Sequence, residues 1–347
     1  MCSIAKDIGI DLGTASVLVY VKGKGVVLNE PSVVAIDKNT GKLLKVGAEA
    51  QAMLGRTPGN IVAIRPLREG VISDYDMTER MLREFLRKVV GGFQLFKPRV
   101  IICVPSGITE VEERAVVDAG IQAGARRVYL IEEPVAAAIG AGIDISKPDG
   151  HMVVDIGGGT TEVAVISLGG IVVSRSVRVG GIRMDAAIIN FIKREFNMLI
   201  GDRTAEDVKF DLGAALPMND VRRAFVRGRD LVTNLPQTAE ITSTMVYEAL
   251  KAPCQAILAA IQYVLERTPP ELAGDVMRSG IHLTGGGALL CGMDRFIATE
   301  LDMPVLLAKE PMDCAALGIG QLAEELELLQ RMCQSAPQRD DEEETTF

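Results

Sequence analysis

The sequence predicts an α/β protein of two related lobes, and two observations carry this prediction. Residues Ile8–Val21 contain an apolar strand, an aspartate, a glycine turn and a second strand, and the same order of features returns over Met152–Ile166. Around these hairpins, short apolar runs of strand length alternate with stretches of helical periodicity. Such alternation is typical of helices that cover a mixed sheet, and the repeat favours two lobes that face each other across a cleft.

The spacing of apolar residues predicts the individual elements. Asp76 and Glu79 have the spacing of a capping box at the start of a helix over 76–90, and Pro105 ends a strand over 100–104. Further helices are expected over 110–123, 185–196, 204–212 and 245–267, with a terminal helix over 314–333. Further strands are expected over 128–131, 171–179 and 281–283.

Composition excludes several classes of protein. The 347 residues are 48% hydrophobic, which is enough for two cores, and the net charge of -9 argues against a nucleic-acid partner. No apolar run reaches the roughly 18 residues of a membrane span, and the N-terminal residues lack the apolar segment of a secretory signal, so we expect a cytoplasmic protein. The scattered cysteines predict reduced thiols, and His151 and His282 lack the surroundings of a zinc or Ser-His site.

Three glycine turns carry the functional signal, because successive backbone N–H groups in a turn form a cradle for an anion. The two hairpins supply such turns at Gly13, Thr14 and Ala15 and at Gly157, Gly158 and Gly159. A third turn follows a strand and could pass close to a nucleoside; it contains Gly285, Gly286, Gly287 and Ala288. One Asp-x-Gly turn is an ordinary hairpin, but the three together predict a nucleotide-phosphate site.

An aspartate ends the strand before each hairpin turn. Asp11 and Asp155 would face each other across the cleft, where carboxylates suit Mg²⁺, which prefers oxygen ligands and keeps waters between itself and the protein. Thr14, Thr160 and Thr161 add hydroxyl donors.

These residues resemble a known superfamily. Asp11-Leu12-Gly13-Thr14, 155–160 and 283–287 look like the phosphate-1, phosphate-2 and adenosine motifs of the actin/Hsp70/sugar-kinase ATPases. Leu28–Val34, Gly55–Asn60, Ile131–Pro134 and 155–167 resemble the bacterial actin family MreB, over about residues 8–330. The resemblance implies a two-lobed actin-like fold of duplicated ribonuclease H-like domains, with four subdomains and with ATP and Mg²⁺ in the central cleft. It also implies slow ATP hydrolysis coupled to filament assembly, and a role in rod cell shape through peptidoglycan elongation.

The resemblance also implies domain bounds. Lobe I is expected over 1–147 with a small subdomain at about 31–75, and the terminal helix at 314–333 is expected to pack back on it. Lobe II is expected over 148–313 with a small subdomain at about 184–244. Residues 335–347 are polar and acidic and are expected to form a disordered tail.

Residue roles carry over by position. Glu133 stands where the superfamily places a polar residue that assists hydrolysis, so it would orient or deprotonate the attacking water beside Asp155. On the residues alone, Glu133 is equally an N-terminal helix charge beside Pro134. Thr160 or Thr161 would help hold that water. The segment expected to reach the ribose and base contains Glu206, Asp207, Val208 and Lys209.

A loop at 91–99 carries a second signal. Phe93, Leu95 and Phe96 are apolar residues flanked by lysine and arginine, a pattern that suits insertion into an anionic lipid surface, although the same side chains could equally form core under the loop. The resemblance favours attachment to the inner face of the cytoplasmic membrane. It also implies self-assembly and membrane-protein partners in the rod complex.

Two positions depart from the family pattern. Ser16 stands where many relatives have Asn, and Ile182 replaces a common acidic residue; neither lies in a phosphate turn.

Three other functions stay open. A chaperone ATPase of the Hsp70 type fits the motifs, but the chain leaves no room for a peptide-binding domain. A sugar-kinase-like enzyme would need a substrate cluster that is not evident, and a scaffold that binds nucleotide without polymerising fits as well.

Overall fold

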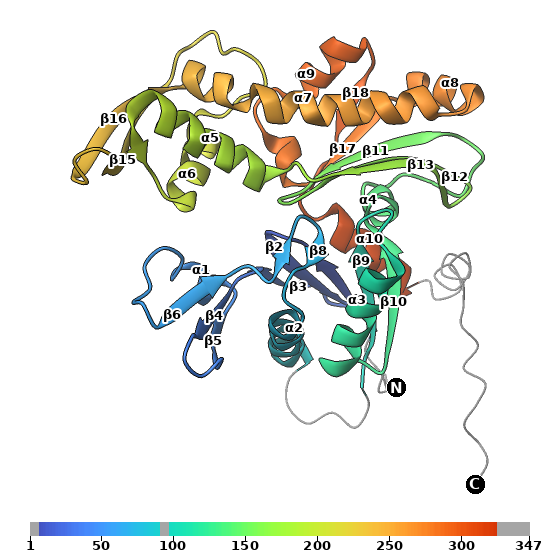
Figure 1. Cartoon of the computed structure of the whole chain (residues 1–347). Helices are drawn as coiled ribbons and strands as arrows, with labels where there is room; N and C mark the ends of the chain where they lie inside the picture. The colour runs from blue at the N-terminus through green and yellow to red at the C-terminus, as the bar shows by residue number, and fades with distance from the viewer. Residues whose placement is uncertain (1–6, 91–96, 325–347) are drawn as a thin grey trace.

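The protein consists of two stacked parts, each built around a five-stranded mixed sheet (Figure 1). The structure is a computed structural model, and it describes residues 7–90 and 97–324. We keep the bounds predicted from the sequence as names for the parts, lobe I up to residue 147 and lobe II over 148–313. In lobe I the sheet order is β10-β9-β1-β2-β3, formed by β1 (Asp7–Leu12), β2 (Ser16–Val21), β3 (Gly25–Pro31), β9 (Arg99–Val104) and β10 (Arg127–Glu132).

The sheet of lobe II has the same construction. Its order is β13-β12-β11-β17-β18, formed by β11 (His151–Ile156), β12 (Thr161–Ser167), β13 (Gly170–Val177), β17 (Ile281–Thr284) and β18 (Val305–Leu307). In both sheets three antiparallel strands are followed by two parallel ones, so β1 and β2 correspond to β11 and β12. The repeat predicted from the two hairpins is therefore confirmed as a repeated sheet.

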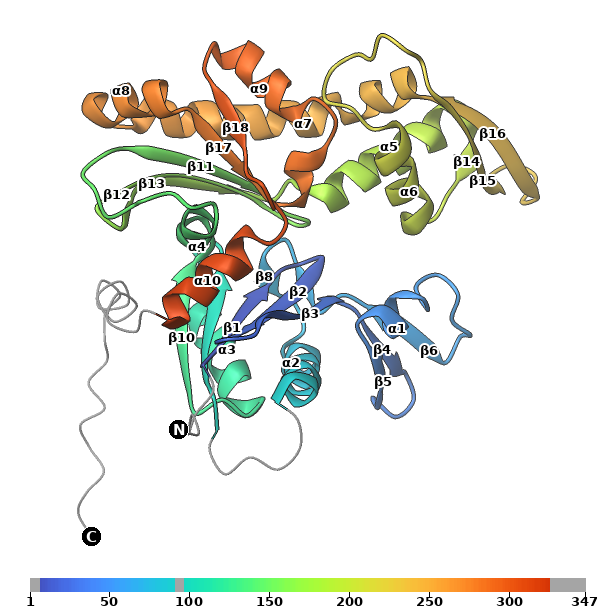
Figure 2. The same ribbon diagram turned by 180° about the vertical axis from the view of Figure 1, so that it is seen from behind.

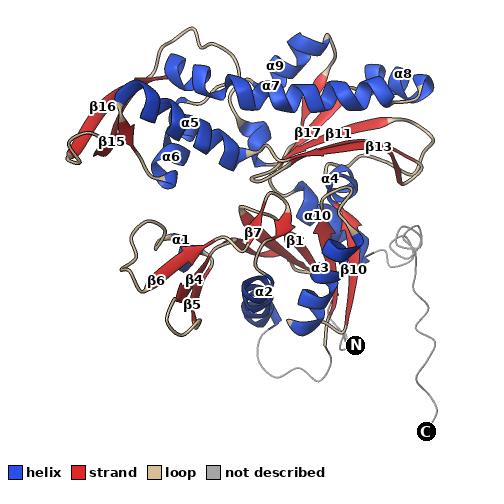
Figure 3. Cartoon of the chain, in the orientation of Figure 1, coloured by secondary structure: helices blue, strands red, loops and turns tan. Residues whose placement is uncertain are grey.

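Helices cover both faces of each sheet, which explains why the inner strands β1, β9, β11 and β12 are mostly apolar and buried. On lobe I, α2 (Tyr75–Val90) and α3 (Glu110–Gln122) share a core with Val100 and Ile102 of β9, whereas Ile101 and Cys103 face the opposite side. On lobe II, α7 (Ser243–Arg267), α8 (Pro270–Ser279) and α9 (Met293–Leu301) lie over the outer face of the sheet (Figure 3).

Two helices lie between the sheets and join the lobes (Figure 2). α4 (Glu133–Gly140) and α10 (Cys314–Glu324) form one core with residues of both sheets. Their backbones touch at two glycines: a Cβ on Gly140 would lie 1.8 Å from the carbonyl oxygen of Cys314, and one on Gly318 would lie 1.9 Å from that of Ala136. Larger residues at these positions would separate the two helices.

Each lobe also carries a small sheet, and both small sheets lie on the same side of the molecule (Figures 1 and 2). In lobe I it consists of β4 (Val34–Asp37), β5 (Leu43–Val46) and β6 (Ile61–Ile64), followed by the hairpin β7 (Leu67–Arg68) and β8 (Val71–Ile72), with α1 (Ala48–Gln51) beside it. In lobe II it consists of β14 (Met198–Leu199), β15 (Arg223–Asp230) and β16 (Pro236–Thr242), next to α5 (Gly181–Phe196) and α6 (Asp202–Leu212).

The predicted capping box at the start of α2 is wrong. The helix already includes Asp76, and Oδ1 of Asp74 accepts the hydrogen bond from the N–H of Met77 at 3.1 Å. Glu79 instead forms an ion pair with Arg83 one turn further along the helix. The spacing rule therefore identified a helix start, but the cap lies two residues earlier.

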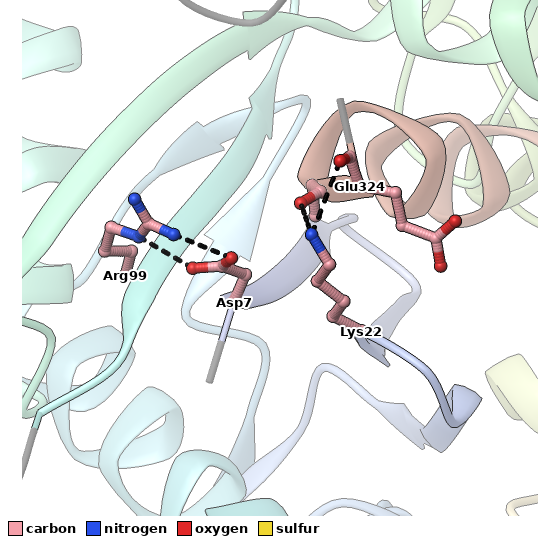
Figure 4. Close-up of polar contacts among 5 residues, drawn as sticks. Asp7, Lys22, Arg99 and Glu324 are labelled. Carbon is pink, nitrogen blue, oxygen red and sulfur yellow. Dashed lines mark hydrogen bonds and ion pairs between the residues drawn. The ribbon is translucent and has the colours of Figure 1, made fainter. Parts of the chain in front are cut away.

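The described part of the terminal helix is anchored to lobe I. The rest of the predicted helix to residue 333 and the tail at 335–347 lie outside the described residues. Lys22 Nζ donates to the carbonyl oxygens of Ala323 at 3.2 Å and Glu324 at 3.4 Å, which ties the end of α10 to β2 (Figure 4). Nearby, the Arg99 guanidinium donates to both carboxylate oxygens of Asp7, at 2.7 and 2.8 Å, and so joins β9 to β1 (Figure 4).

Candidate functional site

A cavity of about 400 Å³ is lined by residues of both lobes. Its walls come from the two hairpin turns, the start of α4, helix α6 and the turn after β17. The predicted site residues that line it are Asp11, Gly13, Thr14, Ala15, Glu133, Asp155, Gly157, Gly158, Gly159, Thr160, Glu206, Lys209, Gly285, Gly286 and Gly287. The fold thus brings together most of the residues that the three motifs singled out.

The two hairpin turns meet face to face in this cavity. A Cβ on Gly158 would lie 2.4 Å from the Cβ of Ala15, and one on Gly159 would lie 2.5 Å from Thr14 Oγ1. No side chain fits at such distances, so glycine is required at both positions by the close approach of the turn from lobe I.

Hydrogen bonds fix the turn of lobe I. Ser32 donates from its hydroxyl to the Gly13 carbonyl at 2.5 Å and from its N–H to the Ala15 carbonyl at 3.0 Å. Gly70, in the β7–β8 hairpin, donates its N–H to Thr14 Oγ1 at 3.0 Å. Within the described residues, the N–H groups of Gly13, Thr14 and Ala15 have no protein acceptor, so they remain free for an anion.

The turn of lobe II is fixed in the same manner. Its carbonyl groups accept hydrogen bonds from the start of α5: the Gly181 N–H donates to Gly157 at 3.0 Å, and the Ile182 N–H donates to Gly158 at 2.9 Å. In the part of the chain that the structure describes, the N–H groups of Gly158 and Gly159 donate to no protein acceptor. The two turns therefore direct free donors into one cavity.

The third turn packs directly on the end of β11. Gly285 has a φ of +79°, and a Cβ there would lie 2.4 Å from the carbonyl oxygen of Ile156. A short 3₁₀ helix, η1 (Gly286–Leu289), follows, and a Cβ on Gly287 would lie 2.3 Å from Ile156 Cγ2. Ala288 is buried and does not line the cavity, so the structure does not bring this predicted residue to the site.

Helix α6 presents only part of its predicted segment to the cavity. Glu206, Lys209 and the unpredicted Phe210 line it, whereas Asp207 is exposed elsewhere and Val208 is buried in the core of lobe II. A helix turns by about 100° per residue, so neighbouring side chains cannot all face one side. The structure therefore brings Glu206 and Lys209 of the predicted segment to the cavity, and not the side chains of Asp207 and Val208.

Lys209 is held by a partner that sequence reasoning missed. Its Nζ lies 2.8 Å from Asp185 Oδ1 and 3.3 Å from the carbonyl oxygen of Gly181, and Asp185 itself lines the cavity. Burial raises the pKa of Asp185, and Lys209 opposes that rise. The sequence marked this loop only through the departure at Ile182.

Three carboxyl groups gather at the centre of the cavity, and their pKa values rise because few water molecules reach them. Burial, with the Asp155 and Asp313 carboxylates, raises the pKa of Asp11 to about 7. Burial raises the pKa of Asp155 to about 6, opposed by the hydrogen bond that Thr284 Oγ1 donates at 2.9 Å. Burial, followed by Asp155 and Asp11, raises the pKa of Glu133 well above its usual range.

The two candidate threonines differ in orientation. Thr160 lines the cavity, whereas Thr161 is fully buried and donates its hydroxyl to the carbonyl oxygen of Val179 at 2.6 Å. The hydroxyl of Thr161 is thus bonded to the backbone, and Thr161 does not line the cavity.

Other lining residues carried no motif in the sequence. Gly70 reaches the cavity from the β7–β8 hairpin, and Cys103 and Pro105 reach it at the end of β9. β9 is parallel to β1, and ligands collect at the carboxyl ends of parallel strands, so the strand prediction could have pointed to the last two.

Two further predictions concern the membrane. None of the helices in the described ranges is long and apolar enough to cross a bilayer. Phe93, Leu95 and Phe96 lie outside the described residues.

Comparisons with known proteins agree with this architecture. A family model described as "MreB/Mbl protein" matches residues 5–331. The cell shape-determining protein Mbl of Bacillus subtilis is 54% identical over 325 residues, which cover 94% of this chain and 98% of the relative. The cell shape-determining protein MreB of Escherichia coli is 51% identical over 329 residues, which cover 93% and 95%.

Solved structures give the same result. The crystal structure of MreB5 of Spiroplasma citri bound to AMPPNP superposes with a TM-score of 0.89 at 39% identity, over 93% of this chain and 97% of that one, and the structure bound to ADP gives the same values. A MamK double helical filament shares the fold, with a TM-score of 0.77 at 23% identity over 92% and 99% of the chains. Because the family model and these relatives span nearly the whole sequence, the chain has the actin-like fold and belongs to the MreB/Mbl family.

Proposed function

We propose that this protein binds and hydrolyses ATP in the cavity between its lobes and assembles into membrane-associated filaments that determine cell shape. The observation that carries the proposal is the meeting of two glycine turns from equivalent hairpins, with Gly158 and Gly159 against Ala15 and Thr14. Such turns leave backbone donors free for phosphate oxygens. The MreB5 structures, one bound to AMPPNP and one to ADP, support a nucleotide as the ligand.

The nucleotide lies along the three turns. The β- and γ-phosphates contact the hairpin turns, and the third turn at Gly285–Gly287 accommodates the adenosine, since all three glycines line the cavity. Glu206 and Lys209 extend from α6 toward the ribose and base, since both line the cavity on the side of lobe II.

The carboxyl groups fit a magnesium ion. Asp11 and Asp155 are acids whose pKa values are raised by burial and, for Asp11, by the facing Asp155, and a divalent cation favours their ionised form. No group of three His, Cys, Asp or Glu side chains within the described ranges could hold a metal ion. Mg²⁺ keeps several waters when it binds protein, so it would contact the carboxylates through water. Bound there, Mg²⁺ would neutralise charge on the phosphates.

Hydrolysis depends on Glu133 and Thr160. Glu133 begins α4 and lines the cavity, and its raised pKa makes the ionised carboxylate a stronger base for a proton of the attacking water. Thr160 completes the positioning of that water, because Thr160 lines the cavity, whereas Thr161 is fully buried and donates its hydroxyl to the Val179 carbonyl. Positioning is most of what phosphoryl transfer requires from a protein.

Assembly and membrane attachment complete the function. The relatives are cell shape-determining proteins, and the shared fold includes a protein solved as a filament. We place the protein in the cytoplasm, peripheral on the inner face of the membrane, attached through Phe93, Leu95 and Phe96. Its filaments organise peptidoglycan elongation through membrane proteins of the rod complex.

Electron microscopy of the purified protein tests the proposal. With Mg-ATP and anionic liposomes we expect filaments on the vesicles, together with phosphate release in solution. ATP binding without filaments would leave a soluble ATPase of the Hsp70 or sugar-kinase type. Absence of ATP binding would remove the proposal altogether.

A further inference from the structure

Glu162 is a buried acid that does not line the cavity and has no role in the chemistry above. It follows the phosphate turn of lobe II, on β12, where it is 1% exposed. Its strand neighbours are Asp155 on β11 and Ser176 on β13, and the Ser176 hydroxyl donates to Glu162 Oε1 at 2.6 Å.

The second oxygen of this carboxylate reaches the other lobe. Glu162 Oε2 accepts the backbone N–H of Ser106 at 3.2 Å, and Ser106 lies in the loop that joins β9 to α3 in lobe I. One side chain thus binds a hydroxyl of its own sheet and a backbone donor of the opposite lobe. The pKa of Glu162 is raised to about 7: burial raises it most, the hydrogen bonds from Ser176 and Ser106 oppose the rise, and the Asp155 and Glu132 carboxylates add to it.

The loop that Glu162 holds forms part of the cavity wall. Pro105 lines the cavity directly before Ser106, and a Cβ on Gly70 would lie 2.9 Å from both Pro105 Cγ and Thr160 Cγ2. The end of β9, the β7–β8 hairpin and the phosphate turn of lobe II therefore meet at one point. Thr160, which we assign to the attacking water, is one of the three parts of this junction.

We propose that Glu162 is a positioning residue that clamps the Pro105–Ser106 loop of lobe I to the phosphate turn of lobe II, and so fixes Thr160 for hydrolysis. This inference rests on the proposed ATPase function. Glu162 does not line the cavity, so it acts through the junction. Its loss lowers the rate of hydrolysis and leaves the nucleotide contacts in place, since none of them comes from Glu162.

The length of the side chain, and not its charge, carries this role. Glu162→Gln keeps the reach, because an amide oxygen accepts the Ser106 N–H and the amide nitrogen can donate to the Ser176 hydroxyl. Glu162→Asp keeps the charge but is one methylene shorter, so it cannot span both partners. Ser176→Ala removes the bond within lobe II and leaves the bridge between the lobes.

Steady-state phosphate release on the full chain measures the effect. We expect Glu162→Asp and Glu162→Leu to lower kcat by about tenfold or more, since small misplacements of reacting groups cost up to about 100-fold, with KM for Mg-ATP within about twofold of wild type. Glu162→Gln and Ser176→Ala should retain kcat within about threefold. An active Asp variant beside an inactive Gln variant overturns the inference, as does an unchanged kcat in the Leu variant.

Hydrogen exchange separates this inference from the proposed function. The peptide that contains Ser106 should exchange faster in Glu162→Asp than in wild type or Glu162→Gln, with or without nucleotide. Equal exchange in all three chains would mean that Glu162 does not hold the Ser106 loop, whatever the value of kcat. If wild type releases no phosphate but the exchange pattern appears, the ATPase proposal fails and the bridge stands as a contact between lobes. If Glu162→Leu fails to fold, the Asp and Gln variants decide alone.

Discussion

Asp11 and Asp155 end equivalent strands of the two sheets and line one cavity, and Asp155 adds to burial in raising the pKa of Asp11 to about 7. Each lobe supplies one acid, so the lobes repel one another at this point when both acids are ionised. Glu133 adds a third acid, whose pKa is raised by burial and then by Asp155 and Asp11. The stability of the folded protein should therefore depend on pH and on bound cations.

We expect the protein without nucleotide and metal to lose stability as the pH rises from about 4 through about 7. The acids bind their protons more tightly in the folded chain than in the unfolded chain, where the pKa of Asp is about 3.9, so the ionised folded state is disfavoured. Thermal unfolding in EDTA at pH 5 and pH 8 measures this, with the lower midpoint at pH 8. Asp11→Asn should reduce the difference; an undiminished difference would contradict the assignment.

Magnesium with AMPPNP should reverse this trend. Cation and nucleotide bind the folded state and compensate the ionised carboxylates, so they should raise the unfolding midpoint more at pH 8 than at pH 5. Unfolding midpoints measured in calcium-free buffers with Mg²⁺ alone, AMPPNP alone and both together separate the contribution of the cation from that of the nucleotide. An equal shift at both pH values would place the cation away from Asp11 and Asp155.

Glu133→Ala should abolish phosphate release and spare ATP binding. A positioned acid or base contributes on the order of 100-fold or more to a rate, and Glu133 occupies the first turn of α4 at the cavity wall. Release is followed with a phosphate sensor, and affinity with a fluorescent ATP analogue. Wild-type turnover in this variant would show that Glu133 serves only the start of its helix.

Thr160→Val and Thr161→Val form a matched pair: the first should change the rate of hydrolysis and the second the stability of the fold. Thr160→Val should lower kcat with little change in stability, because Thr160 lines the cavity. Thr161→Val leaves the half-buried carbonyl of Val179 without its donor and should lower the free energy of unfolding by about 1 kcal/mol. Turnover and urea denaturation on both variants test the assignment, and the reverse pattern would exchange the two roles.

The sequence predicted the parts of the fold that rest on local pattern. Two hairpins with an aspartate and glycine turn indicated the repeated sheets, and the turns themselves proved to line the cavity at Gly13 and at Gly157–Gly159. A repeat of turn chemistry is readable because the same backbone geometry demands the same residue types.

Other features depended on tertiary packing and left no trace in local pattern. Asp185 reaches Lys209 from a different helix, and Gly70 reaches Thr14 from a separate hairpin. Within α6 the family motif covers successive residues, but the helix turns Val208 into the core. Motif resemblance therefore identified the segment, and only the helical geometry decides which of its side chains face the cavity.

Asp185→Asn should weaken ATP binding by about tenfold, which corresponds to about 1.4 kcal/mol. The change removes the charge that holds Lys209 at 2.8 Å, so the lysine loses its fixed position in the cavity wall. Titration with a fluorescent nucleotide gives the affinity. Asp211→Asn is the control, because Asp211 is exposed on α6 and does not line the cavity. Equal affinities in both variants would mean that Lys209 needs no partner to bind nucleotide.

Replacing Phe93, Leu95 and Phe96 with serine should abolish co-sedimentation with anionic liposomes. Burial of apolar side chains in the lipid contributes about 25 cal/mol per Å², so three such residues supply most of the attachment, and neighbouring cations add attraction to anionic headgroups. Val232 and Leu235 are 79% and 62% exposed in lobe II, and their replacement by serine is the matched control for lost surface hydrophobicity. The control should sediment with vesicles as wild type does. If the loop variant still binds, or if neutral vesicles bind equally well, another part of the chain attaches the filament to the membrane.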